Sequence, residues 1–252
     1  MTIVSAYKSD TGRRRKRNED FVWADKSTRL FIVADGMGGH EAGDVASQLA
    51  ATTVGELITS ELKVKTEPIL PALVVRMMTD AVEAANKTVF KAAKEAGQKR
   101  QMGTTIVVAL VRSSVAYISH VGDARAYLVR GATLMQLTKD DSWKVQFGDK
   151  NISSKTDIPE GKFDHILTKA IGQDTTLDPS STEVKLTPGD WLLLCSDGLW
   201  NMVEDEQILA ELQKADNNPD QAVEALIAAA NEGGGKDNIS VAAIKVLPTE
   251  NA

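Results

Sequence analysis

Cysteine is almost absent from the chain, which has one among its 252 residues, Cys195. A single cysteine excludes an internal disulfide framework and fits a reducing compartment. Long apolar runs are absent too, so no segment is expected to span a bilayer, and the first residues lack the charged and apolar stretches of a secretory signal. We therefore expect a cytoplasmic protein with no membrane partner.

The chain also lacks the residues that several other classes of protein need. Its 29 basic residues are outnumbered by 35 acidic ones, whereas a nucleic-acid-binding protein normally carries a basic footprint, so no nucleic-acid partner is expected. The three histidines, His40, His120 and His165, are too scattered for a zinc motif. No Gly-Lys-Ser/Thr follows the glycine-rich segment 36–39, which argues against a nucleotide-binding loop. Cys195 lies in an apolar segment with no base suggested nearby, which indicates a buried core position rather than a nucleophile.

The length and the 42% hydrophobic content suit one domain that spans residues 1–252. Apolar residues recur with helical spacing over residues 42–58 and 70–85, and Glu67-Pro68 suits the first turn of the second helix. Strand-like segments joined by short turns follow, beginning with residues 104–111, and predict antiparallel pairing. The remaining expected elements are strands at 2–8, 21–24, 30–34, 115–121, 125–129, 133–137, 182–186, 191–195 and 239–246, and helices near 204–214 and 219–231.

The order of these elements decides the fold class. Strands, two helices, many strands, two helices and a final strand do not alternate as in a parallel α/β fold. We therefore expect an α+β sandwich of antiparallel sheets covered by helix pairs. Residues 140–172 lose this periodicity and are rich in polar residues, glycine and proline. A loop of that length inside a compact domain is usually functional or mobile.

Four aspartates stand beside predicted strands. Asp35, Asp123 and Asp197 each follow a strand-like segment, and Asp237 precedes one. A single aspartate in such a place is usually a turn former or a helix cap, and spacing alone does not prove that the four converge. Carboxylates gathered at a sheet edge repel one another unless a cation neutralises them, and oxygen ligands favour Mg²⁺ or Mn²⁺ over Zn²⁺ or Cu²⁺. Two such ions close together can bind a bridging water, lower its pKa and direct it at a phosphorus atom.

A basic run, Arg13-Arg14-Arg15-Lys16-Arg17, leads into Asn18-Glu19-Asp20. It suits a solvated loop, a nuclear-localisation signal or a nucleic-acid patch. It also suits a phosphate clamp beside an acidic metal site, because an arginine binds phosphate oxygens bidentately and lysine does so less well. The chemistry of the run leaves open which arginine that would be.

Six ordered segments resemble the motifs of the protein phosphatase 2C family, also called PPM. Together they cover essentially the whole chain, and the Gly-Met-Gly-Gly-His form of the second is similar to the bacterial branch. The segments are residues 9–20 (SDTGRRRKRNED), 33–40 (VADGMGGH), 102–105 (MGTT), 121–125 (VGDAR), 194–199 (LCSDGL) and 234–241 (GGKDNISV).

The resemblance implies a four-layer α-β-β-α sandwich, two antiparallel β-sheets flanked by helix pairs, with two metal ions at one end. It implies that Asp35 bridges both ions and that the carbonyl of Gly36 binds one of them. Asp197 and Asp237 would bind the other.

Further residues take roles from the same resemblance. Glu19 and Asp20 would act through water bound near the ions. Asp123 matches an aspartate that many relatives use for a third, weaker ion. Arg15 stands in the place of the phosphate-binding arginine, and residues 140–172 in the place of a mobile flap.

The activity that the resemblance implies is hydrolysis of phosphoserine and phosphothreonine in proteins, by attack of a water that bridges two Mn²⁺ or Mg²⁺ ions. The partners would be phosphorylated proteins, the substrates of a cognate Ser/Thr kinase in bacterial signalling, and the enzyme would be a monomer. The alternative is a pseudophosphatase that binds phosphoproteins without turnover. The presence of Asp35, Asp197 and Asp237 argues against it.

Two positions depart from the family pattern. Many bacterial relatives have histidine after Leu-Thr-x-Asp, where this chain has Asp141, and we interpret this as a change in specificity or in the position of the flap. Eukaryotic relatives have a histidine, proposed as general acid, directly after the Asp-Gly pair, where this chain has Met37. The leaving-group proton must therefore come from a metal-bound water or another group.

Overall fold

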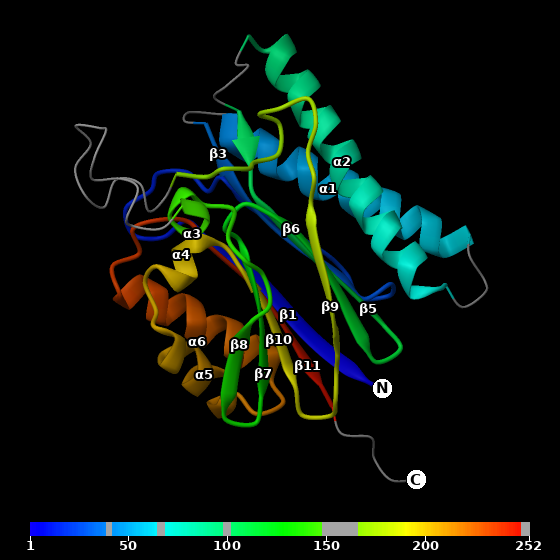
Figure 1. Cartoon of the computed structure of the whole chain (residues 1–252). Helices are drawn as coiled ribbons and strands as arrows, with labels where there is room; N and C mark the ends of the chain where they lie inside the picture. Colours follow the sequence, from blue (N-terminus) through cyan, green and yellow to red (C-terminus); the bar gives the residue numbers. More distant parts are fainter. Residues whose placement is uncertain (39–41, 65–68, 98–101, 148–165, 248–252) are drawn as a thin grey trace.

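The computed structural model describes residues 1–38, 42–64, 69–97, 102–147 and 166–247. Two antiparallel sheets lie face to face at its centre (Figure 1). One sheet has the strand order β1 (Ile3–Asp10), β11 (Ile239–Val246), β10 (Trp191–Cys195), β7 (Arg125–Arg130) and β8 (Thr133–Gln136). The other has the order β2 (Asp20–Asp25), β3 (Leu30–Met37), β5 (Ile106–Arg112), β6 (Val115–Val121) and β9 (Ser180–Lys185), and the short β4 (Gly103–Thr104) pairs with the end of β3.

Helices cover the outer face of each sheet. α1 (Ala42–Val64) and α2 (Pro71–Glu95) pack on the sheet that contains β3, and α5 (Asp205–Lys214) and α6 (Pro219–Glu232) pack on the sheet that contains β11 (Figure 1). Two short helices, α3 (Trp143–Phe147) and α4 (Asp197–Trp200), lie in connections. The predicted four-layer α-β-β-α sandwich is confirmed. Within the described ranges, no helix combines the length and the apolar character that crossing a membrane requires.

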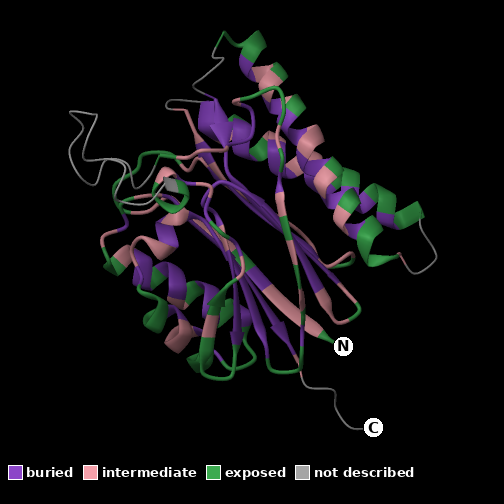
Figure 2. Ribbon diagram, in the orientation of Figure 1, coloured by how far each residue is buried: buried purple, intermediate pink, exposed green. Residues whose placement is uncertain are grey.

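The sequence of β3 shows how the layers pack. Leu30 and Ile32 belong to the buried cluster beneath α1 and α2, whereas Phe31 and Val33 belong to the cluster between the two sheets. Because both faces of the strand are buried, its sequence is a continuous apolar run instead of an alternating one. Figure 2 shows this interior as the buried residues along both sheets and the inner sides of the helices.

The start of α2 differs from the prediction. The helix begins at Pro71, and Glu67-Pro68, which the sequence assigned to its first turn, lie outside the described residues. Leu70 precedes the helix in an extended conformation (φ −61°, ψ 142°), which a residue before proline favours, and Pro71 occupies the first turn. The apolar pattern did not distinguish between two nearby prolines that both suit this position.

Only part of the predicted flap, residues 140–172, is described, because residues 148–165 lie outside the described ranges. The two flanks of that segment pair with each other. Ser142 forms a β-bridge with Leu167, and the N–H of Trp143 donates to the carbonyl of Ile166 at 2.8 Å. The mobility of the segment stays a prediction.

Candidate metal centre

The strand ends that carry the predicted aspartates meet at one end of the sandwich. In one sheet, Cys195 at the end of β10 pairs with Val241 near the start of β11 and with Arg125 at the start of β7. In the other sheet, Asp20 of β2 pairs directly with Asp35 of β3. The antiparallel register therefore brings together residues that are far apart along the chain.

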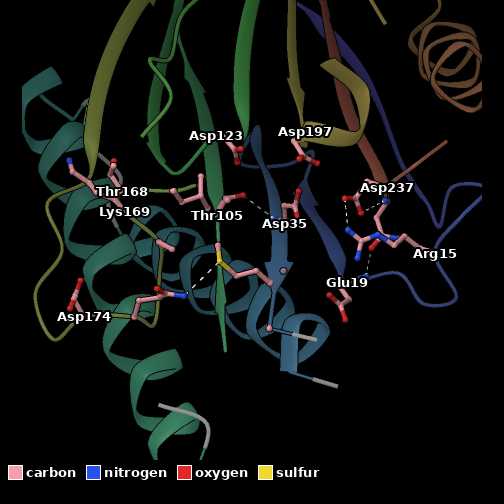
Figure 3. A pocket seen from close by; sticks show the side chains of 17 residues that line it. Arg15, Glu19, Asp35, Thr105, Asp123, Thr168, Lys169, Asp174, Asp197 and Asp237 are labelled. Atoms are coloured by element: carbon pink, nitrogen blue, oxygen red, sulfur yellow. Dashed lines mark hydrogen bonds and ion pairs between the residues drawn. The ribbon is translucent and has the colours of Figure 1, made fainter. Parts of the chain in front are cut away.

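A cavity of about 640 Å³ opens at this end (Figure 3). Seven of the eight residues that the sequence assigns to the site line it, and the exception is Asp20. Asp20 is buried, and the hydroxyl of Ser196 donates to its Oδ2 at 2.7 Å. The predicted residues that line the cavity are Arg15, Glu19, Asp35, Gly36, Asp123, Asp197 and Asp237.

Burial and mutual repulsion raise the pKa values of the carboxyl groups. Burial raises the pKa of Asp123 to about 7, and the nearby charge of Asp197 adds to the shift. The pKa of Asp35 lies well above its usual range, first because the group is removed from water and then because Asp20 and Asp197 are close. Burial also raises the pKa values of Asp20 and Glu19. This arrangement is unfavourable for a set of negative charges, and a cation would relieve the repulsion.

The donor set fits hard divalent cations. Every predicted ligand is a carboxylate or a backbone carbonyl, the oxygen donors that Mg²⁺ and Mn²⁺ prefer. Asp20 Oδ1 is buried without a hydrogen-bond partner among the described residues, and a water or an ion would satisfy it. In the described part of the chain, no three carboxyl or imidazole groups already surround one point. The carboxylates that line the cavity suit Mg²⁺ or Mn²⁺, and Mg²⁺ usually keeps several of its waters in proteins.

Backbone contacts fix Asp35 at the floor of the cavity. Its carbonyl accepts a hydrogen bond from the N–H of Thr105 at 2.9 Å, and the N–H of Gly36 donates to the carbonyl of Glu19 at 3.1 Å. A Cβ at Gly36 would lie 2.1 Å from the carbonyl oxygen of Gly43 and 2.5 Å from that of Glu19. Glycine is therefore required where β3 passes the start of α1.

The residues that hold Asp123 were missed by sequence reasoning. Trp200 Nε1 donates to the carbonyl oxygen of Asp123 at 3.1 Å. The guanidinium of Arg125 lies 3.6 Å from the centroid of the Trp200 ring and donates to Asp140 from Nε at 3.0 Å and from Nη2 at 2.7 Å. Arg125 stood inside a recognised motif, but no signal linked that motif to a tryptophan far along the chain.

Arg15 reaches the cavity from the loop between β1 and β2. Its Nη2 donates to Asp237 Oδ2 at 2.6 Å, and half of its side chain is exposed. Burial acts to lower the pKa of the guanidinium, but the hydrogen bond to Asp237 and the charges of Glu19 and Asp35 raise it by more. Of the five residues in the basic run, Arg15 is the one that lines the cavity.

The wall of the cavity that faces Arg15 across Asp35 comes from residues 167–174, which begin inside the predicted flap, residues 140–172 (Figure 3). It includes Thr168 and Lys169, and Gln173 lies beside Met37 with Nε2 3.8 Å from the sulfur. None of them was named as a site residue, although Thr168 and Lys169 belong to the predicted flap. Their segment has neither a motif nor a period that would single them out.

Comparison with known proteins connects this site to a family. Residues 13–228, well over half of the chain, match the family model described as protein phosphatase 2C. The chain is 34% identical over 238 residues to the serine/threonine phosphatase stp of Listeria welshimeri, which covers 93% of this chain and 92% of that protein. It is 32% identical over 242 residues to the protein phosphatase PhpP of Streptococcus pneumoniae, with 94% and 95% covered.

A solved structure shows the same likeness in three dimensions. It is the catalytic domain of the serine threonine protein phosphatase PstP in complex with two manganese ions. The two chains are 33% identical and superpose with a TM-score of 0.82. The match covers 98% of this chain and 99% of the PstP catalytic domain. The chain belongs to the protein phosphatase 2C family.

Proposed function

We propose that the chain is a metal-dependent protein phosphatase that hydrolyses phosphoserine and phosphothreonine. One observation carries the proposal: a ring of carboxylates surrounds a single cavity, with the guanidinium of Arg15 beside it. The carboxylates suit divalent cations, and the guanidinium suits a phosphate. Membership of the protein phosphatase 2C family supports the same activity.

The residues divide by the group that each would bind. Arg15 would bind phosphate oxygens and so orient the phosphorus atom for attack. Two Mn²⁺ or Mg²⁺ ions, when bound, would supply a water of lowered pKa as the nucleophile. The residues that would hold these ions are Asp35, Gly36 through its carbonyl, Asp197 and Asp237, with Glu19 and Asp20 acting through water.

The alkoxide of serine or threonine is a poor leaving group and needs a proton. Met37 lies beside Gln173 at the edge of the cavity and has no proton to give. We assign the delivery of this proton to water held near Asp123. With Asp197, Asp123 would also hold a third and weaker cation.

Manganese-stimulated hydrolysis tests the proposal, with p-nitrophenyl phosphate and a phosphothreonine peptide as substrates. We expect turnover of both with Mn²⁺, and no turnover after chelation or in Asp35→Asn. Circular dichroism should show that this variant keeps its fold, because the substitution removes one charge from a repelling cluster. Phosphopeptide binding without turnover at any Mn²⁺ concentration would instead support the pseudophosphatase alternative.

We further propose that the enzyme works as a monomer of one domain in the cytoplasm, on substrates of a cognate Ser/Thr kinase. The apolar cluster shared by both sheets supports the single domain, and the free, buried Cys195 suits a reducing compartment. Light scattering would report the mass. A phosphoproteome compared with and without the gene would identify the substrates.

A further inference from the structure

One side-chain amide closes the loop that carries Arg15. The amide nitrogen of Asn238 donates to the carbonyl oxygens of Thr11 and Arg17, both at 2.9 Å, and its oxygen accepts from the N–H of Glu19 at 2.8 Å. The start and the end of the basic loop therefore meet on one residue. Asn238 is only 3% exposed, so these three hydrogen bonds are shielded from water.

Other anchors of the loop are also polar and lie close to Asn238. The N–H groups of Arg13 and Arg14 donate to the carbonyl of Gly235 at 2.8 and 3.1 Å. Gly12 has a φ of 77°, and a Cβ there would lie 2.1 Å from the carbonyl oxygen of Asp237. The side chains of residues 13–17 are exposed, so apolar packing adds little to the position of the loop.

We propose that Asn238 is a positioning residue that aims Arg15 into the cavity by holding both ends of its loop. The inference rests on the proposed function, in which Arg15 binds the substrate phosphate. The chemistry calls for a short amide, because two carbonyls need two N–H donors while one N–H needs an acceptor. An aspartate would keep the acceptor and place a carboxylate oxygen against two carbonyl oxygens.

The location of Asn238 separates positioning from general stability. It directly follows Asp237, the residue that Arg15 contacts at 2.6 Å, so adjacent residues hold the guanidinium and the backbone of its loop. A displaced loop would move Arg15 and Glu19. Asp35 would lose support only from the bond between Gly36 N–H and the carbonyl of Glu19, and its contacts with Thr105 do not involve the loop. Loss of Asn238 should therefore weaken phosphate binding more than it slows the chemical step.

The test compares Asn238→Asp and Asn238→Ala with the unmodified chain and with Asp190→Asn. Asp190 is a matched control because it is 1% exposed, accepts hydrogen bonds from Arg130 and from the N–H of Thr187, and lies at the opposite end of β10. Removal of the two amide donors is expected to raise KM for a phosphopeptide, and the inhibition constant of inorganic phosphate, by about tenfold. The value of kcat should change much less, and Asp190→Asn should change neither constant.

A double-mutant cycle decides whether Asn238 acts through Arg15. In the Arg15→Ala background, Asn238→Asp should add little to KM, and an equal increase in both backgrounds would overturn the inference.

Hydrogen exchange of residues 11–19 gives a readout that needs neither metal nor substrate. Protection should fall in Asn238→Asp and persist in Asp190→Asn, and unchanged protection would also overturn the inference. Asn238→Asp keeps the side-chain volume and carries the test if Asn238→Ala does not fold. An unmodified chain without turnover would contradict the proposed function alone, since hydrogen exchange still decides the role of Asn238.

Discussion

Arg15 approaches the cavity from a loop whose neighbouring basic side chains are exposed to solvent. Its replacement by alanine is expected to raise KM for phosphopeptides roughly tenfold or more, because a charge-assisted bidentate contact contributes about 1.5–3 kcal/mol. The affinity for Mn²⁺ should change far less, since the guanidinium is not a ligand. Steady-state kinetics and calorimetric Mn²⁺ titration measure the two quantities, with Arg14→Ala as the matched control. An effect on KM in Arg13→Ala or Arg14→Ala, and none in Arg15→Ala, would contradict the assignment.

Asp123 is held from outside the cavity by the indole of Trp200. Asp123→Ala should leave the two tight metal sites intact and lower kcat on phosphopeptides. The decrease should be smaller with p-nitrophenyl phosphate, whose leaving group depends less on a proton. Mn²⁺ titration and kcat on both substrates test this together. Equal losses on the two substrates, or loss of the tight sites, would falsify the proposed role.

The sequence predicts the carboxylates of the site better than it predicts the residues that hold them. An aspartate beside glycine at a strand end can be recognised in the sequence, because an apolar strand-like segment directly precedes or follows it. Asn238 and Trp200 act on the backbone carbonyls of Thr11, Arg17 and Asp123. Every residue has such a carbonyl, so no residue type marks the partner, and only the register between strands brings the groups together.

At the scale of the elements, most predicted strands and the last two helices agree with the structure to within about three residues. The first two helices were predicted too short, because α1 extends to Val64 and α2 to Glu95, beyond the predicted ends at residues 58 and 85. The short helices α3 and α4 were not predicted. Helix α4 spans four residues, Asp197–Trp200, about one turn, and has too few positions to show a period. The strand expected at 104–111 is divided in the structure into β4 and β5. The division lies at Thr105, whose N–H donates to the carbonyl of Asp35. A contact of the functional site thus interrupts a strand that the apolar pattern predicts to be continuous.

Asp141 links two segments that border the cavity. Its Oδ2 accepts from the N–H of Gly122 at 3.1 Å, and its backbone carbonyl accepts from the N–H of Thr168 at 2.8 Å. Asp141→Ala would leave the N–H of Gly122 without this acceptor, and we expect the free energy of unfolding to fall by about 1–3 kcal/mol. Urea unfolding measures the change. We expect the side chain of Asp141 to fix the turn that carries Asp123, at the position where many bacterial relatives have a histidine.

Two further variants separate the hydrogen bond of Asp141 from its ion pair. Asp141 Oδ1 lies 3.6 Å from Lys169 Nζ, and 36% of the lysine side chain is exposed, so this pair should contribute less than about 1 kcal/mol. Asp141→Asn keeps an oxygen for Gly122 and should resemble Lys169→Ala in causing only a small loss. A loss in Asp141→Asn as large as that in Asp141→Ala would show that the charge matters more than the hydrogen bond.

At the scale of the whole molecule, the cluster of carboxyl groups makes stability depend on pH. Burial raises the pKa of Asp123 from 3.8 to about 7, and it shifts the pKa values of Asp20 and Asp35 in the same direction. A carboxyl group with a higher pKa in the folded chain binds its proton more tightly when folded. Its contribution to stability is therefore full below the unfolded pKa, near 4, and is lost as the pH rises through the folded value, about 7.

The metal-free protein is accordingly expected to lose thermal stability as the pH rises from about 4 to about 7. Mn²⁺ replaces the protons as the compensating charge, so it should raise Tm most at the upper end of this range and release protons when it binds near neutral pH. Calorimetric scans with and without Mn²⁺ measure the first effect, and titrations in two buffers of different ionisation enthalpy count the protons. Asp20→Asn removes one titrating carboxyl group and should flatten the metal-free slope. A metal-free Tm that rises over the same range would show that repulsion within the cluster does not limit the folded state.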